Sequence, residues 1–216
     1  MIIKSFELEK IKQLNYNIHL IYGNNEGIKQ DIIKNYYLKS FIGEILKYDE
    51  QEILNNKDEF LSSLSTKSLF ENNKIIIISR ATDKLTDVII DIIKKSEIET
   101  KIIIKCSNLE KKSKLRNLIE KEKKEVCTPV YEDDARSLNI VINNFLKEKK
   151  FNLSQEIKNV LIERSKGDRI NLKNELLKLE NLQISKNKLS TDDVLKLSNL
   201  AENFSVFELS DNYLAK

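Results

Sequence analysis

The chain has 216 residues, of which 40% are hydrophobic and 33% are charged, and its formal net charge is +3 at pH 7. This balance allows a buried core and is too apolar for a generally disordered chain. Two cysteines without C-x-x-C spacing exclude a disulfide-stapled scaffold and a cysteine zinc site, and one histidine leaves no basis for a His-based triad. The longest apolar run, Ile75 to Ile78, is too short to span a bilayer, and the N-terminus lacks the apolar core of a signal peptide. We therefore expect a cytoplasmic protein without a membrane partner.

Up to about residue 130, short Ile-rich runs alternate with longer amphipathic stretches. The runs predict strands at 18–22, 45–48, 75–79, 102–104 and 126–128. Apolar residues at helical spacing predict helices at 28–36, 85–93 and 109–124, and one or two helices within 60–70 with a break near Ser65. Strands alternating with helices indicate right-handed crossovers and a parallel sheet, so this part is predicted to be α/β.

After Pro129 the pattern is helical only. Amphipathic stretches begin at Ala135, after Ser154 and after Asp168, with Gly167 placed as a C-terminal cap and Ser190 opening a capping box. We predict an α/β domain at 1–135 and a small helical domain at 136–203.

The loop after the first strand is where a phosphate-binding loop would stand. A P-loop reads G-x-x-x-x-G-K-[ST], so that backbone amides cradle the phosphates and the hydroxyl holds Mg²⁺. Here Gly23 and Gly27 are one residue too close, Lys29 is displaced and Gln30 replaces the hydroxyl. Glu26 would also oppose the phosphate charge. The loop is degenerate and is not expected to function.

No acidic pair follows the buried run at 75–78, where a metal-binding carboxylate would be needed; the first acid is Asp83. We therefore expect no ATP hydrolysis, no metal and no cofactor. Cys106 and Cys127 end apolar runs and are interpreted as inert buried thiols, and His19 as structural. The acids of Glu132 to Asp134 are placed on a surface-like segment.

Two surface features remain. The stretch at 111–124 holds seven basic and two acidic residues. Its lysines and arginine, Lys111, Lys112, Lys114 and Arg116, are possible DNA contacts, although a solvated helix face is the simpler interpretation. Leu69 and Phe70 stand side by side amid polar residues, which suits either a helix end beneath the sheet or an exposed plug for a partner's pocket.

In order along the chain, four stretches resemble the delta subunit of bacterial DNA polymerase III, a clamp-loader protein. They are the strand at 18–22 with its degenerate loop, Ser68-Leu69-Phe70 before Lys74 and the Ile run, the strand and Lys-rich turn at 102–118, and Gly167-Asp168-Arg169 leading to Asn174-Glu175-Leu176. Lys74 stands where the family often has Arg.

The resemblance implies an AAA+-like (RecA-like) domain without a working ATP site, a helical lid domain, and at 204–216 only the opening of a collar domain. It implies a non-catalytic subunit that opens the sliding clamp (the beta subunit) within the polymerase III holoenzyme, a nucleotidyltransferase complex at the nucleoid. Lys67, Ser68, Leu69 and Phe70 would bind the clamp. Subunits of the gamma/tau and delta-prime types would be partners, held weakly without the collar, and DNA would be contacted weakly or indirectly. An atypical P-loop ATPase and a DNA-binding module built on Lys111 to Lys124 remain as alternatives.

Overall fold

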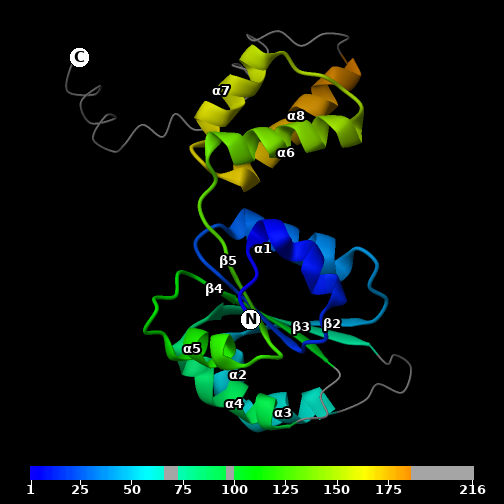
Figure 1. Cartoon of the computed structure of the whole chain (residues 1–216). Coiled ribbons are helices and arrows are strands. Elements are labelled where there is room, and N and C mark those ends of the chain that lie inside the picture. Colours follow the sequence, from blue (N-terminus) through cyan, green and yellow to red (C-terminus); the bar gives the residue numbers. More distant parts are fainter. Residues whose placement is uncertain (66–72, 96–99, 186–216) are drawn as a thin grey trace, which may run out of the picture. The chain divides into compact units, whose positions relative to one another are not determined.

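The computed structural model describes residues 1–65, 73–95 and 100–185 (Figure 1). The chain forms two compact units, Met1–Tyr131 and Glu132–Lys216. Within the described ranges, no helix has the length and apolar character needed to cross a membrane.

The first unit is built on a five-stranded sheet in which every pair of neighbouring strands is parallel. The strand order is β2-β3-β4-β1-β5. All five predicted strands are confirmed, with bounds β1 Ile18–Tyr22, β2 Glu44–Asp49, β3 Lys74–Ala81, β4 Lys101–Cys106 and β5 Val126–Pro129. Because β1 lies between β4 and β5, the loop that follows β1 meets the carboxyl ends of both neighbours.

Helices cover both faces of this sheet (Figure 1). They are the 3₁₀ helix η1 Ser5–Gln13, α1 Glu26–Ile32, the π-helical η2 Ile33–Leu38, α2 Glu50–Asn55, α3 Lys57–Ser65, the 3₁₀ turn η3 Asp83–Leu85, α4 Thr86–Lys94 and α5 Lys114–Lys121. The prediction of a helix from residue 109 is wrong, because the Ser113 hydroxyl caps the Arg116 amide and starts α5 five residues later. Neither η1 nor α2 was anticipated.

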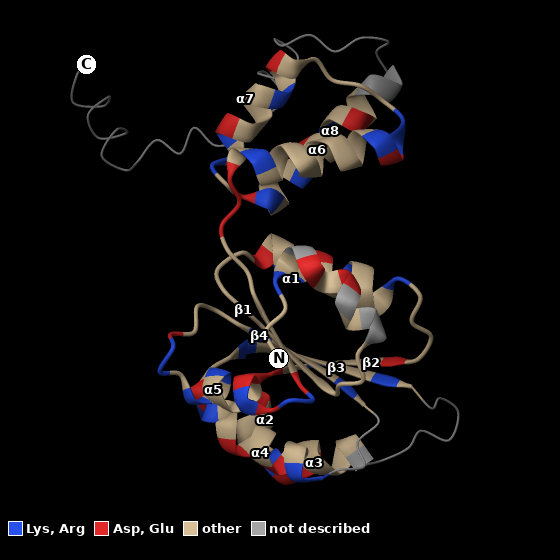
Figure 2. Ribbon diagram, viewed as in Figure 1, with Lys and Arg blue, Asp and Glu red and all other residues tan. Residues whose placement is uncertain are grey.

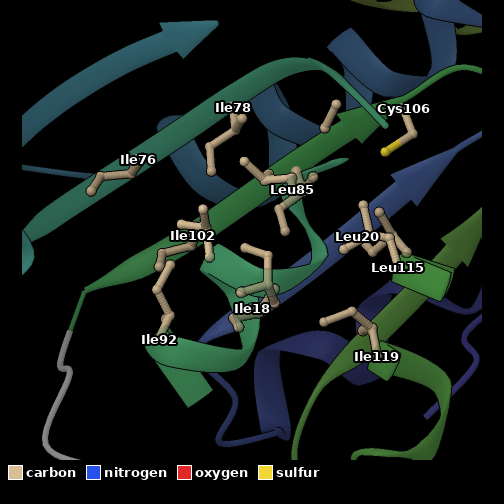
Figure 3. Close-up of a cluster of buried hydrophobic side chains, with 14 of the residues drawn as sticks. Ile18, Leu20, Ile76, Ile78, Leu85, Ile92, Ile102, Cys106, Leu115 and Ile119 are labelled. Carbon is tan, nitrogen blue, oxygen red and sulfur yellow. The ribbon is translucent and has the colours of Figure 1, made fainter. Parts of the chain in front are cut away.

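Two apolar cores explain why the strands are apolar on both faces. On one side, Ile76, Ile78 and their neighbours pack against α2 to α5 (Figure 3). On the other, Ile75, Ile77 and Ile103 pack with η1, α1 and η2. Alternate side chains of one run therefore serve opposite cores, as expected for a strand covered on both sides.

The second unit contains α6 Ala135–Lys149, α7 Gln155–Ser165 and α8 Arg169–Ser185 in its described part. Leu residues from all three helices, such as Leu138, Leu161 and Leu176, form its core. The Ser154 and Asp168 caps are confirmed, since Ser154 accepts from the Ile157 amide and Asp168 from the two amides that follow it by two and three residues. The predicted capping box at Ser190 lies outside the described residues.

Candidate functional site

The loop after β1 is held by close backbone contacts. Gly23 has φ +131°, and a Cβ there would lie 1.9 Å from the Val130 carbonyl oxygen, so only glycine fits. The Gly23 amide donates to the Ser107 carbonyl at 3.1 Å. The turn is therefore fastened to the segments that follow β4 and β5.

Helix α1 begins directly at this turn. The Asn25 side-chain oxygen accepts from the Ile28 amide at 2.9 Å and so caps the helix, and its amide group donates to the Tyr131 carbonyl at 3.0 Å. Gly27 lies buried in the first turn of α1. Asn25 thus joins the loop to the chain that leaves β5.

Lys29 turns inward from α1. Its ammonium lies 2.5 Å from a Glu26 carboxylate oxygen and 2.6 Å from the Cys106 carbonyl oxygen at the end of β4. The Lys29 side chain is 1% exposed and that of Glu26 50% exposed. In a phosphate-binding loop a lysine contributes its charge to the bound phosphates. Here the charge is neutralised by the Glu26 carboxylate, which stands in the first turn of the same helix.

The acids near the carboxyl edge of the sheet hold other parts of the protein. Glu50, buried at the start of α2, accepts from the amide and hydroxyl of Thr82 at 2.5 and 3.0 Å. Asp83 accepts from the Ser113 hydroxyl at 2.5 Å and the Leu115 amide at 3.0 Å. Desolvation opposes ionisation of Asp83, but these hydrogen bonds outweigh it and lower its pKa. Among the described residues, no group of three or more His, Cys, Asp or Glu could hold a metal ion.

His19 lies at the centre of a buried polar chain on β1. Its Nε2 is 2.7 Å from the Thr128 hydroxyl, its Nδ1 contacts the Tyr37 hydroxyl, and the latter is 2.7 Å from the hydroxyl of Tyr16. Burial lowers the pKa of His19 to about 3, so its ring is neutral. The expected structural role fits these contacts.

Both cysteines are free and buried, as expected. Burial raises the pKa of Cys106 and of Cys127 to about 12, which leaves the thiols protonated and unreactive.

Figure 2 shows basic and acidic residues close together on α5, where two of the four possible DNA contacts, Lys114 and Arg116, belong. By their contacts, the four fall into two groups. Arg116 donates to Glu120 at 2.7 Å and to the Leu109 carbonyl at 3.1 Å, and its guanidinium lies 4.9 Å from the Tyr22 ring centroid. These contacts bind Arg116 to its own unit. The other three, Lys111, Lys112 and Lys114, are exposed, and Lys112 has a surface ion pair with Glu110.

The clamp-binding candidates Lys67, Ser68, Leu69 and Phe70 lie outside the described residues. The framework on either side of them is described: α3 ends at Ser65, β3 begins at Lys74, and the Lys74 ammonium donates to the Ser63 carbonyl at 3.2 Å. The two ends of the intervening segment are thus tied together.

Glu132 and Asp134 are exposed, as expected for a surface-like segment, but the side chain of Asp133 between them is not. Its side chain is 1% exposed and accepts two hydrogen bonds from Arg169, at 2.8 and 2.5 Å, and one from the Ser137 hydroxyl at 2.7 Å. Sequence pattern could not reveal this, because Asp133 and Arg169 are 36 residues apart and each stands among other charged residues.

No family model and no curated protein matches the sequence. Several solved structures are similar to the chain. The DNA clamp loader delta protein of Bacillus subtilis aligns with a TM-score of 0.61 and 14% identity, covering 98% of this chain and 66% of that one. The RuvB Holliday junction branch migration motor of Thermotoga maritima aligns with a TM-score of 0.55 and 14% identity, covering 89% of this chain and 64% of that one.

Domain III of the replication initiation protein DnaA, also from Thermotoga maritima, aligns with a TM-score of 0.50 and 17% identity, covering 92% of this chain and 90% of that one. The chain thus spans about two thirds of the clamp-loader and RuvB chains. At these identities the similarity concerns the fold. The parallel sheet, its helices on both faces and these neighbours together show that the chain has an AAA+-like α/β fold.

Proposed function

We propose that the chain is a non-catalytic clamp-loader subunit of the delta type, which binds and opens a sliding clamp so that it can be loaded on DNA. The observation that carries the proposal is the Lys29 ammonium, held between Glu26 and the Cys106 carbonyl. A loop that supplies its own anion needs no nucleotide to stabilise that buried charge. The clamp loader delta protein of Bacillus subtilis aligns over 98% of this chain, which supports the same proposal.

Clamp opening by such a subunit is a matter of differential binding. The subunit must bind the opened clamp more tightly than the closed one, because a ligand with equal affinity for both states shifts nothing. Leu69 and Phe70 are the proposed anchors in an apolar pocket of the clamp. Lys67 and Ser68 are proposed to border this contact.

By itself the subunit is proposed to have no enzymatic activity and no cofactor. It would act within the polymerase III holoenzyme at the nucleoid, where motor subunits of the gamma/tau type hydrolyse ATP and a delta-prime type subunit completes the loader. The resemblance of the sequence to the delta family supports these partners.

Release of a clamp from circular DNA tests the proposal, because a closed ring can leave a closed circle only by opening. We expect the chain to release a labelled clamp from nicked circular DNA without any nucleotide. A clamp covalently closed across its subunit interfaces is the control and should stay on the DNA. Release that requires Mg-ATP would instead favour an atypical ATPase.

The exposure of Lys111, Lys112 and Lys114 favours a second candidate, direct binding of DNA backbone. Such binding would be independent of sequence and would weaken steeply with salt. Direct DNA binding could accompany clamp opening or be a separate function. An assay of DNA binding in the absence of a clamp measures it independently of clamp opening.

A further inference from the structure

The connector between the two units, residues 130–134, runs from β5 to α6 (Figure 1). Its first part is fastened to the first unit. The Val130 amide donates to the Tyr22 carbonyl at 2.8 Å, and the Val130 side chain is buried against the sheet. One residue later, the Tyr131 carbonyl accepts from the Asn25 amide group at 3.0 Å. The loop after β1 therefore holds the connector as far as Tyr131.

The last part of the connector is fastened to the second unit. Asp133 carries the buried two-point bond from Arg169 at the start of α8. Asp134 caps α6: it accepts from the Ser137 amide at 2.7 Å, and its own amide donates to the Ser137 hydroxyl at 3.0 Å. Asp133 and Asp134 thus belong mechanically to the helical unit.

Between these anchors stands one exposed residue, Glu132. Over the described part of the chain, no hydrogen bond or ion pair involves it. We infer that Glu132 is the pivot between the two units and that Asn25 is the latch that confines bending to this residue. Since each residue has only two soft backbone dihedrals, anchoring Tyr131 and Asp133 leaves very few rotations available. The inference stands whether or not the chain opens clamps.

Asn25 makes the latch sensitive to the loop. The same side chain caps α1 through its oxygen and holds the connector through its nitrogen. A conformational change in the loop after β1 would therefore release Tyr131 and extend the flexible part of the connector toward Val130.

Spin labels on each unit test the inference in the full chain. Asp87→Cys on α4 and Asn144→Cys on α6 are exposed positions, and the two native cysteines are buried, so labelling should be confined to the introduced thiols. Asn25→Asp keeps the capping oxygen and removes the amide donor. We expect it to broaden the interspin distance distribution on the order of twofold, as a loosened hinge would.

Arg169→Lys, which removes the two-point bond, should also broaden the distribution. Asn24→Asp adds the same charge one residue before the latch at an exposed site, and Arg136→Lys changes an exposed arginine; both controls should leave the width unchanged. Equal widths in wild type, Asn25→Asp and Arg169→Lys would overturn the inference, as would equal broadening by Asn24→Asp.

Circular dichroism would show whether the anchor variants remain folded. If either variant unfolds, Glu132→Gly becomes the test, because the position is exposed and has no hydrogen bond among the described residues. Glycine allows more backbone conformations, so it should broaden the distribution at the pivot. An unchanged width in Glu132→Gly would overturn the assignment of the pivot.

Discussion

The Lys29 ammonium and the Glu26 carboxylate form an ion pair at 2.5 Å at the start of α1, directly after the loop where a nucleotide-binding protein would hold phosphate. The two residues are three apart on one helical turn, so the helix itself places the carboxylate beside the ammonium. The Cys106 carbonyl, 2.6 Å from the same ammonium, ties the pair to the end of β4. The start of α1 is thus stabilised by its own ion pair and by a hydrogen bond to β4.

Removing the counter-charge should destabilise the first unit. In Glu26→Gln the buried Lys29 ammonium keeps its hydrogen bond to the Cys106 carbonyl but loses its carboxylate partner. We expect the free energy of unfolding to fall by about 1–2 kcal/mol. The half-exposed position of Glu26 limits the effect. Urea unfolding followed by circular dichroism measures the change. Glu110→Gln, which breaks the exposed pair with Lys112, is the matched control and should cost less than about 0.5 kcal/mol.

The double variant Glu26→Gln/Lys29→Met should recover part of the loss. It replaces a buried charge with an apolar side chain of similar length, a change that often costs little. A double variant less stable than Glu26→Gln alone would show that Lys29 contributes in some way other than through its charge.

Mg-ATP should leave the thermal unfolding temperature unchanged. A ligand that binds only the native state, present at a concentration about 100 times its dissociation constant, would raise the free energy of unfolding by about 2.7 kcal/mol. Thermal unfolding readily detects a change of that size. We expect no shift at millimolar Mg-ATP, because the Lys29 ammonium already binds the Glu26 carboxylate and the Cys106 carbonyl. A saturable rise in unfolding temperature that Lys29→Met abolishes would contradict this and support an atypical ATPase.

Stability should fall between neutral pH and moderately acidic pH because of His19. Its pKa is about 3 when folded and 6.5 ordinarily, so below pH 6.5 the unfolded chain takes up a proton that the folded chain does not. Unfolding then becomes easier by about 1 kcal/mol for each pH unit below that value, and the penalty stops growing near the folded pKa. His19→Gln, neutral throughout, should flatten this dependence.

The measurement is the free energy of unfolding of both proteins in buffers from about pH 7.5 to pH 5, a range that spans the ordinary histidine pKa. Carboxylates with lowered pKa values, such as Asp83, contribute equally to both proteins and cancel in the difference. Identical slopes for wild type and His19→Gln would mean that His19 is not the group responsible.

Charge reversal at Lys111, Lys112 and Lys114 should abolish whatever affinity the chain has for duplex DNA. Each lost phosphate contact reduces the slope of log affinity against log salt by roughly one. The control is charge reversal at Lys47, Lys147 and Lys150, which are also exposed but lie elsewhere, and it should change the slope little. Arg116→Gln should lower stability rather than DNA affinity, because Arg116 packs on Tyr22 and Glu120. DNA binding that survives the Lys111/Lys112/Lys114 reversal would exclude this surface.

The strands were predictable because local sequence determines them. Runs such as Ile75–Ile78 are apolar on both faces, and only a strand covered on both sides satisfies them. The mismatch of the loop with a P-loop was equally visible, since spacing alone decides it. The Glu26–Lys29 pair could have been anticipated from its spacing of three residues on a helix.

The rest depended on contacts between distant segments. His19 meets Thr128 across 109 residues, and Asp133 meets Arg169 across 36, and no local periodicity encodes either contact. The start of the helix predicted at 109–124 is wrong because the single hydroxyl of Ser113 caps α5 and so places its first residue at Lys114.

Binding to the cognate sliding clamp is the measurement that most directly tests the proposed function. The wild-type chain, a Leu69→Ala/Phe70→Ala variant and a Leu54→Ala control, which truncates an exposed apolar residue on α2, would be compared by surface-immobilised binding. We expect wild type and control to bind alike and the double variant to lose on the order of 2 kcal/mol or more per anchor, which would abolish detectable binding. A folded wild-type chain that does not bind the clamp, or a double variant that binds as well as wild type, would contradict the proposed function.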